Sequence, residues 1–155
     1  MKTKQAWFDE YAVSHQNKTN KAIHFICVPA IFFSIVGMLM SINTNFLTRI
    51  FAINNPLIEN WAVVVLFLLL FLFYLRLSFK TFLIMTLFSA LCIYLNSIIG
   101  NNTSLFYTSL GIFIIAWIGQ FYGHHIEGKK PSFLKDLQFL LVGPIWVFHK
   151  ILGFS

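Results

Sequence analysis

The stretch TFLIMTLFSALCIYLNSII, residues 81–99, contains no charged side chain. A helix that crosses the hydrocarbon core of a bilayer needs about 20 predominantly apolar residues, within a range of about 17–25. This stretch therefore predicts a membrane-spanning helix. The whole chain of 155 residues is similar in character, with 58% hydrophobic and 10% charged residues. Soluble domains are about 45–50% apolar and about 25% charged, so we predict an all-α integral membrane protein.

Three further apolar runs are long enough to cross a membrane. They are bounded by polar, Asn-rich or basic residues, and they cover residues 23–40, 61–77 and 104–122. No internal repeat or low-complexity tract interrupts the chain. We therefore predict a single membrane domain over residues 1–155 with about four transmembrane helices.

Short interfacial helices are expected near both ends of the chain. Residues 7–15 can form an amphipathic helix ahead of the first span. Residues 132–141 can form another helix, which Gly143-Pro144 is expected to end. The last stretch, residues 145–154, is too short to span comfortably, so we expect it to lie in the interface or to pack back on the bundle.

The placement of Lys and Arg predicts the orientation of the spans, because cytoplasmic segments carry an excess of both. Residues 1–22 hold four lysines, and the segment after residue 122 holds four more. Arg76, at the end of the second span, and Lys80 flank the link between the second and third spans. The first link holds only Arg49, and the third link holds no basic residue. With four spans the basic regions all fall on one side, so both termini are predicted to be cytoplasmic.

The net charge of +6 does not indicate a nucleic-acid partner. The basic residues are spread over segment ends and are not gathered into a patch with base-stacking aromatic residues. Residues 1–22 are rich in charged residues and have no apolar core, so we expect no secretory signal peptide. Membrane orientation accounts for the charge, and the predicted partner is the lipid bilayer.

Four of the five histidines lie in two polar clusters at the ends of apolar runs. The first cluster, HQNKTNKAIH, covers residues 15–24, and the second, QFYGHHIEGKKP, covers residues 120–131. The predicted orientation places both clusters at the same cytoplasmic interface. Ionisable residues at membrane depth are costly and usually functional, so the clusters indicate a metal or proton site.

Helical spacing separates the two histidines of the second cluster. If the fourth span continues as a helix, Gln120, His124 and Glu127 share one face. His125 is rotated by roughly 100° from His124 and points elsewhere. We therefore interpret His124 with Glu127 as the functional pair.

The first cluster needs a break in the helix to bring its histidines together. His15 and His24 are nine residues apart and would face opposite sides of one continuous helix. The Asn-rich stretch between them is expected to break the helix, with Thr19 or Asn20 as the cap of the next one. The two histidines can then converge, and Asn20 shares a helix face with His24.

Three imidazoles, one carboxylate and open coordination positions suit an iron or zinc site. The predicted catalytic residues are His15, His24, His124 and Glu127, of which the histidines are the predicted metal ligands. No HExxH, CxxC or compact series of histidine boxes is present. Nearby polar side chains are expected to fix the imidazole tautomers by hydrogen bonding; these are Asn17, Asn20, Gln120 and Asp136.

The two histidine clusters are also compatible with roles that need no metal. A lone histidine at a membrane interface is more often a hydrogen-bonding residue than a ligand, and we interpret His125 and His149 in that way. A transporter or proton relay would use His24, His124 and Glu127, although transporters often show repeats and broken spans near the midplane. A di-iron hydroxylase or desaturase needs more histidines than the five present. A purely structural protein would tolerate replacement of the histidines.

The two histidine motifs resemble those of the 2-hydroxy fatty acid dioxygenase family of small membrane proteins. The first motif is Y-x3-H-x-N-x2-N-x3-H-x4-P over residues 11–29, and the second is Q-x2-G-H-x2-E-x3-P over residues 120–131. The resemblance includes residues 136–138 and 143–144 and covers nearly the whole chain. The best-known member of the family is a fungal endoplasmic-reticulum enzyme of phytosphingosine degradation, and many relatives are bacterial.

The resemblance implies an Fe(II)-dependent oxygenase that acts on a 2-hydroxy fatty acid. The family reaction uses O2 to remove the carboxyl carbon and gives a fatty acid one carbon shorter. Family histidines implicated in iron binding correspond to His15, His24 and His124, and Glu127 matches the acidic position of the second motif. The carboxylate and hydroxyl of such a substrate can chelate iron while the acyl chain stays among the spans. Lysines expected to attract the carboxylate are Lys18, Lys21, Lys129 and Lys130.

The composition also predicts the membrane in which the protein resides. A chain rich in Lys, Asn, Ile and Phe is typical of an AT-rich bacterial genome. We therefore expect a bacterial inner membrane, or the endoplasmic reticulum membrane if the source is eukaryotic.

Overall fold

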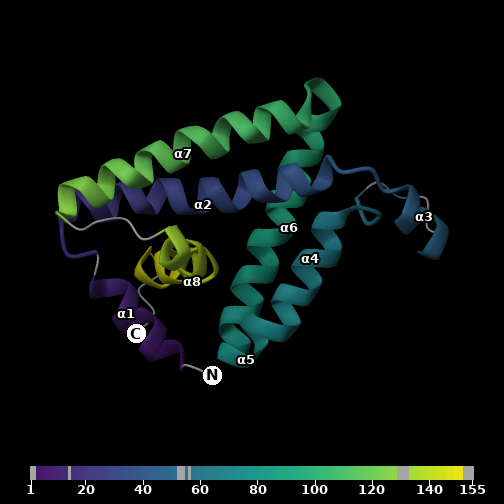
Figure 1. The fold of residues 1–155 in the computed structure, drawn as a ribbon. Helices are drawn as coiled ribbons and strands as arrows, with labels where there is room; N and C mark the ends of the chain where they lie inside the picture. The colour runs from purple at the N-terminus through teal and green to yellow at the C-terminus, as the bar shows by residue number, and fades with distance from the viewer. Residues whose placement is uncertain (1–2, 14, 52–54, 56, 129–132, 152–155) are drawn as a thin grey trace. The chain divides into compact units, whose positions relative to one another are not determined.

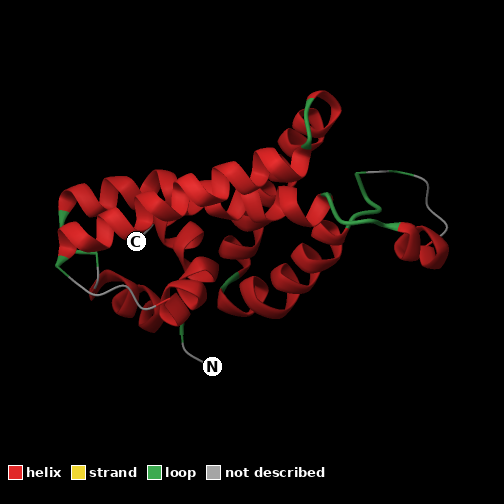
Figure 2. Cartoon of the chain, turned by 45° about the horizontal axis from the view of Figure 1, so that its top comes forward, coloured by secondary structure: helices red, strands yellow, loops and turns green. Residues whose placement is uncertain are grey.

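All regular secondary structure in the described chain is helical, with short loops between the helices (Figures 1 and 2). The computed structural model describes residues 3–13, 15–51, 55, 57–128 and 133–151, with side chains for all of these except 48, 51, 133–138, 140 and 151. No strand occurs in these ranges, which confirms the prediction of an all-α protein.

Within the described ranges, three helices are long and apolar enough to cross a membrane, which fits the prediction of a membrane protein. They correspond to the spans predicted at 23–40, 81–99 and 104–122, but each extends further into the neighbouring polar sequence. The helices are α2 (Lys18–Met40), α6 (Phe79–Asn102) and α7 (Leu105–Glu127).

The run predicted as the second span forms a shorter apolar helix, Trp61–Leu77. It consists of α4 (Trp61–Leu69), a π-helical turn (Leu70–Tyr74) and α5 (Leu75–Leu77). The link before it contains a further short helix, α3 (Asn45–Phe51).

The chain divides into two compact units, residues 33–111 and residues 1–32 with 112–155. In the unit of residues 33–111, a buried asparagine joins two of the long helices. Asn96 of α6 donates from Nδ2 to the backbone carbonyls of Phe33 in α2, at 3.1 Å, and of Cys92, at 2.9 Å. Gly37 of α2 allows this approach, because a Cβ there would overlap with Asn96 Oδ1.

The other unit holds both histidine clusters. It combines α1 (Lys4–Val13), the N-terminal part of α2, the C-terminal part of α7, and α8 (Phe133–Ile151). Its apolar core is formed by one residue of α1, one of α2 and two of α8, with phenylalanines packed around them. The four core residues are Tyr11, Val28, Trp146 and Val147.

The prediction that Gly143-Pro144 ends a helix is wrong, because α8 continues through both residues. A proline inside a helix costs about 3 kcal/mol. Ile145, Trp146 and Val147 are at most 3% exposed, and full burial of an apolar side chain contributes about 1.5–3 kcal/mol. Packing of this last part of α8 therefore outweighs the proline, and the described part of residues 145–154 packs on the bundle.

Candidate metal centre

Three histidines from separate parts of the sequence come together in one unit. His15 lies between α1 and α2, His24 in the second turn of α2, and His124 in the last turn of α7. One ring nitrogen of each lies within 4.8 Å of the others, and all three side chains are buried. His125, in contrast, is exposed. The break between α1 and α2 is what allows His15 to reach His24.

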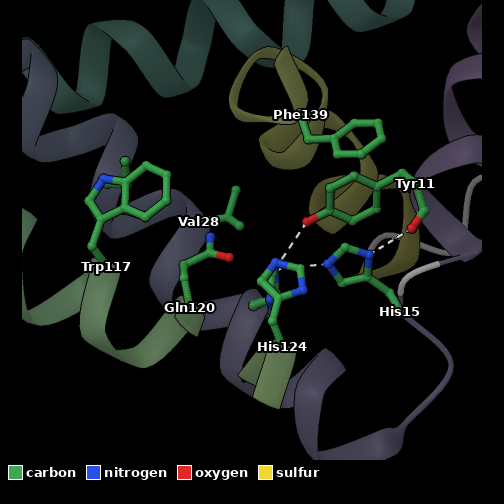
Figure 3. Close-up of a pocket in the computed structure, with 9 residues that line it drawn as sticks. Tyr11, His15, Val28, Trp117, Gln120, His124 and Phe139 are labelled. Atoms are coloured by element: carbon green, nitrogen blue, oxygen red, sulfur yellow. Dashed lines mark hydrogen bonds between the residues drawn. The ribbon is translucent and has the colours of Figure 1, made fainter. Parts of the chain in front are cut away.

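The orientation of His15 is fixed by Tyr11, one helical turn earlier (Figure 3). His15 Nδ1 lies 2.6 Å from the backbone carbonyl of Tyr11, which can only accept, so Nδ1 carries the proton and donates it. The Tyr11 ring stacks on the imidazole, with centroids 3.9 Å apart and planes 5° apart. Burial lowers the pKa of His15 to about 4, since a charged ring is disfavoured away from water. The ring is therefore neutral at neutral pH, with its lone pair on Nε2.

The contacts of His24 fit a bound divalent metal ion. His24 Nδ1 lies 3.0 Å from His15 Nε2 and 3.3 Å from the Tyr11 hydroxyl. Zinc–nitrogen bonds are about 2.0–2.1 Å long, so two nitrogens on one ion are separated by about 3 Å. A neutral imidazole has one lone pair, so His24 can bind a metal through either Nδ1 or Nε2. Nε2 is buried and has no hydrogen-bond partner among the described residues, and a metal ion bound there would relieve the cost of that burial. Three imidazoles are also a donor set that iron and zinc accept.

The three histidines line a small pocket (Figure 3). Its volume is about 10 Å³, which is close to the smallest cavity that holds one water molecule. Gln120 lies one turn before His124 on α7 and faces the same pocket, as its spacing predicts. The remaining lining is mostly apolar; it comprises Tyr11, Val28, Ile31, Trp117 and Phe139.

Glu127 ties the end of α7 to the segment that carries His15. Its Oε1 accepts the backbone N–H of Gln16 at 2.8 Å. Its Oε2 accepts the backbone N–H of Asn17 at 3.0 Å and the side-chain N–H of Asn20 at 2.9 Å. A carboxylate at the start of α2 is also favoured by the helix dipole. Glu127 does not line the histidine pocket, so the geometry gives it a positioning role, and its predicted catalytic role stays a prediction.

Asn17 caps α2, two residues before Thr19 and three before Asn20, the two predicted caps. Its Oδ1 accepts the backbone N–H of Thr19 at 2.8 Å and that of Asn20 at 3.4 Å. The prediction failed because the helix begins at Lys18, within the Asn-rich stretch that was expected to be a break. Asn17 thus shapes the segment beside His15.

Gly123 allows α7 to lie against α2 at the histidines. A Cβ at this position would overlap with Asn20 Oδ1 and would lie 3.4 Å from His24 Cδ2. A larger residue would displace the Asn20 side chain, which donates a hydrogen bond to Glu127, and would crowd His24. Among the other predicted site residues, the side chain of Asp136 and all of Lys129 and Lys130 lie outside the part of the chain that the structure describes.

Sequence reasoning did not assign two aromatic residues to the site. Tyr11 contacts both His15 and His24, and its spacing of four residues from His15 was a usable signal, because a helical carbonyl lies near the residue four positions later. Trp146 packs against Tyr11 and His15, with ring centroids 4.9 and 5.8 Å away. No local pattern links Trp146 to residues so far away in the sequence.

Comparison with known proteins agrees with the motifs. The Mpo1-like family, described as 2-hydroxy-palmitic acid dioxygenase Mpo1-like, matches residues 1–154. The 2-hydroxy-palmitic acid dioxygenase MPO1 of Saccharomyces cerevisiae (strain ATCC 204508 / S288c) is 32% identical over 146 residues, which are 92% of this chain and 75% of the yeast protein. No solved structure matches the chain. The family match extends over both histidine clusters and the helices between them, and this chain belongs to the Mpo1-like family.

Proposed function

We propose that the protein is an Fe(II)-dependent dioxygenase that shortens a 2-hydroxy fatty acid by one carbon, with His15, His24 and His124 as the iron ligands. The observation that carries this proposal is the cluster of three buried histidines whose ligand atoms lie within 4.8 Å of one another. The name of the yeast relative, a 2-hydroxy-palmitic acid dioxygenase, supports the choice of substrate and oxidant.

The proposed reaction balances with O2 as the oxidant. A 2-hydroxy acid and O2 give the acid one carbon shorter, carbon dioxide and water. The bond between the first and second carbons breaks, the second carbon becomes the new carboxyl carbon, and O2 takes the released electrons. Iron would supply the redox chemistry that O2 requires and a Lewis acid for the oxygens of the hydroxy acid.

The chain itself contributes orientation and shielding. The Tyr11 carbonyl holds the proton on His15 Nδ1, which keeps Nε2 available as a ligand atom. Glu127 holds the segment of His15 against α7 through three hydrogen bonds. Gln120 supplies a neutral amide in the pocket, where it can hydrogen-bond to an oxygen of the substrate. The apolar lining limits water around the reacting atoms.

The proposal includes the membrane arrangement. The chain forms one membrane domain with four spans, made of α2, the apolar helix Trp61–Leu77, α6 and α7, and both termini are cytoplasmic. Three span-length helices and the excess of lysine at both ends support this arrangement. A bacterial inner membrane is the proposed location. Reporter fusions at each terminus and at residue 102 test the proposed topology. A periplasmic signal from either terminus contradicts it.

The first test is the metal content of protein purified anaerobically in detergent. We expect about equimolar iron in the wild type and its loss in the single variants His15→Ala, His24→Ala and His124→Ala. His125→Ala is the matched control, because His125 is an exposed neighbour of His124 and should keep the iron. A wild type that takes up no metal after Fe(II) addition refutes the proposal, and ion flux into liposomes without metal would then favour a transporter.

The second test is the reaction itself. Iron-loaded protein is mixed with O2 and a series of 2-hydroxy fatty acids, and the products are identified by mass spectrometry. We expect an acid one carbon shorter than the substrate, together with carbon dioxide. An iron-loaded protein that converts no member of the series contradicts the proposed activity but leaves the metal site standing.

A further inference from the structure

A second and much larger cavity lies between α1 and α8, in the same unit as the histidines. Its volume is about 230 Å³, compared with about 10 Å³ for the histidine pocket. One face of α1 and the last turns of α8 form its walls. The residues that line it include Lys4, Phe8 and Asp9 of α1 and Trp146, His149 and Lys150 of α8.

The cavity has an excess of positive charge. Lys4 and Lys150 line it from opposite helices, and each ammonium lies 5.9 Å from the centroid of an aromatic ring, Phe8 for Lys4 and Trp146 for Lys150. Neither lysine forms an ion pair with a carboxylate in the described part of the chain. Asp9 also lines the cavity, but its Oδ1 accepts a hydrogen bond from the Gln5 amide at 2.8 Å. Two lysines without an acidic partner therefore face one space.

The inner wall of the cavity is aromatic and buried. Trp146 is 3% exposed and His149 is 6% exposed. The ring of Phe8 lies edge-on to His149, with centroids 5.1 Å apart. The wall therefore offers an apolar surface directly beside the two ammonium groups.

Trp146 also connects this cavity with the histidine pocket. It lines the cavity and packs against Tyr11 and His15. The histidine pocket has room for about one water molecule, which is too little for the head group of a lipid. A molecule held in the larger cavity would therefore lie one aromatic side chain away from the proposed iron ligands.

We propose that the cavity between α1 and α8 binds the anionic head group of a long-chain amphiphile. Its carboxylate or phosphate lies between the ammonium groups of Lys4 and Lys150, and its first methylenes lie against Phe8 and Trp146. A fatty acid and an anionic phospholipid share this chemistry. Identifying the fatty acid with the substrate rests on the proposed function, whereas the anion site itself does not.

The test measures binding without turnover. Iron-loaded full-length protein in neutral detergent is dialysed against radiolabelled palmitate, which lacks the 2-hydroxyl group, and against hexadecanol, which has the same chain length and no charge. Palmitate should bind more tightly than hexadecanol. The double variant Lys4→Gln/Lys150→Gln should weaken palmitate binding about tenfold, as expected for two partly exposed charge contacts, and leave hexadecanol binding unchanged. Lys4→Arg/Lys150→Arg should restore palmitate binding, and Lys80→Gln, in the other unit, is the control.

The outcomes separate the possible occupants. Displacement of palmitate by phosphatidylglycerol, but not by phosphatidylcholine, identifies a bilayer phospholipid as the occupant. Displacement only by fatty acids identifies the substrate or product as the occupant. Both results support the anion site. A double variant that keeps its iron and binds palmitate as tightly as the wild type overturns the proposal. If the double variant loses iron, the exposed single change Lys150→Gln gives the same comparison. Failure of the proposed function is distinct, because palmitate would still bind while no shortened acid forms.

Discussion

Replacement of Glu127 with alanine tests whether a carboxylate outside the histidine pocket controls metal binding. In the wild type, both oxygens of Glu127 hold the segment from Gln16 to Asn20 against the end of α7. The alanine variant keeps the three histidines but removes this tie. His15, next to Gln16, then loses the contact that positions it beside His24 and His124. We expect weaker iron binding in a protein that is still folded.

The expected magnitude follows from the three hydrogen bonds. Hydrogen bonds to charged groups contribute about 1.5–3 kcal/mol each when buried. Glu127 is only partly buried, so we take about 1 kcal/mol for each bond. The sum of about 3 kcal/mol corresponds to roughly a hundredfold loss in iron affinity, because each 1.4 kcal/mol is about tenfold.

Anaerobic competition with a chelator of known affinity measures this loss directly. Glu127→Gln keeps one carbonyl oxygen that can accept backbone N–H groups, so we expect a loss of about tenfold or less. Glu10→Ala removes a carboxylate from the same unit without changing the hydrogen bonds of Glu127, and this variant should bind iron like the wild type. Thermal unfolding of each apo variant checks that the fold is retained.

Two results would refute this reasoning. An alanine variant with wild-type iron affinity would show that the three hydrogen bonds do not hold His15 in its binding position. A glutamine variant that loses iron as completely as the alanine variant would make Glu127 a metal ligand, in line with the role predicted from its position in the motif. The two variants together therefore distinguish positioning from ligation.

Three other substitutions have defined outcomes. Tyr11→Phe should keep iron affinity, measured by chelator competition, within about tenfold, because the backbone carbonyl and the ring remain. Tyr11→Ala should lower the free energy of unfolding, measured by thermal unfolding, by about 3–5 kcal/mol. Gly123→Ala should lower the free energy of unfolding by about 1–3 kcal/mol through overpacking and should lower the iron content. Gly111→Ala on the same helix has nothing within 4 Å of the added Cβ and should change neither quantity. Equal effects of the two variants would contradict the close approach at Gly123. Asn96→Leu should lower the free energy of unfolding by about 1–2 kcal/mol, because two hydrogen bonds are lost. Asn102→Leu, at an exposed site, should lower it less, and thermal unfolding measures both variants.

The helices were predictable from the sequence because hydropathy depends on composition over a window. The apolar runs at 23–40, 81–99 and 104–122 correspond to α2, α6 and α7. The helix ends were less predictable, because they depend on caps and on tertiary contacts. The clearest failure is at Pro144, where local propensity indicates an end and the buried residues after it keep α8 continuous.

The histidines of the candidate site were predictable for a related reason. Polar residues in an apolar chain stand out, and helical spacing separates His124, which is 5% exposed, from the exposed His125. The partners of the histidines were not predictable in this way. The four-residue spacing between Tyr11 and His15 was the one local signal for the carbonyl that His15 binds. The backbone N–H groups bound by Glu127 become available only where the helix is interrupted.

That interruption explains why the metal centre and the helix start belong together. The first N–H groups of a helix have no partner within the helix. At the start of α2, Asn17 and Glu127 supply acceptors for the N–H groups of this region and of the segment just before it. The same break turns His15 out of the helical path so that its Nε2 comes within 3.0 Å of His24 Nδ1. A continuous helix would satisfy its own N–H groups, but it would separate His15 from His24. Glu127 therefore stabilises the backbone conformation on which convergence of the three histidines depends, and a residue without contact to the proposed metal ion can still control whether it binds.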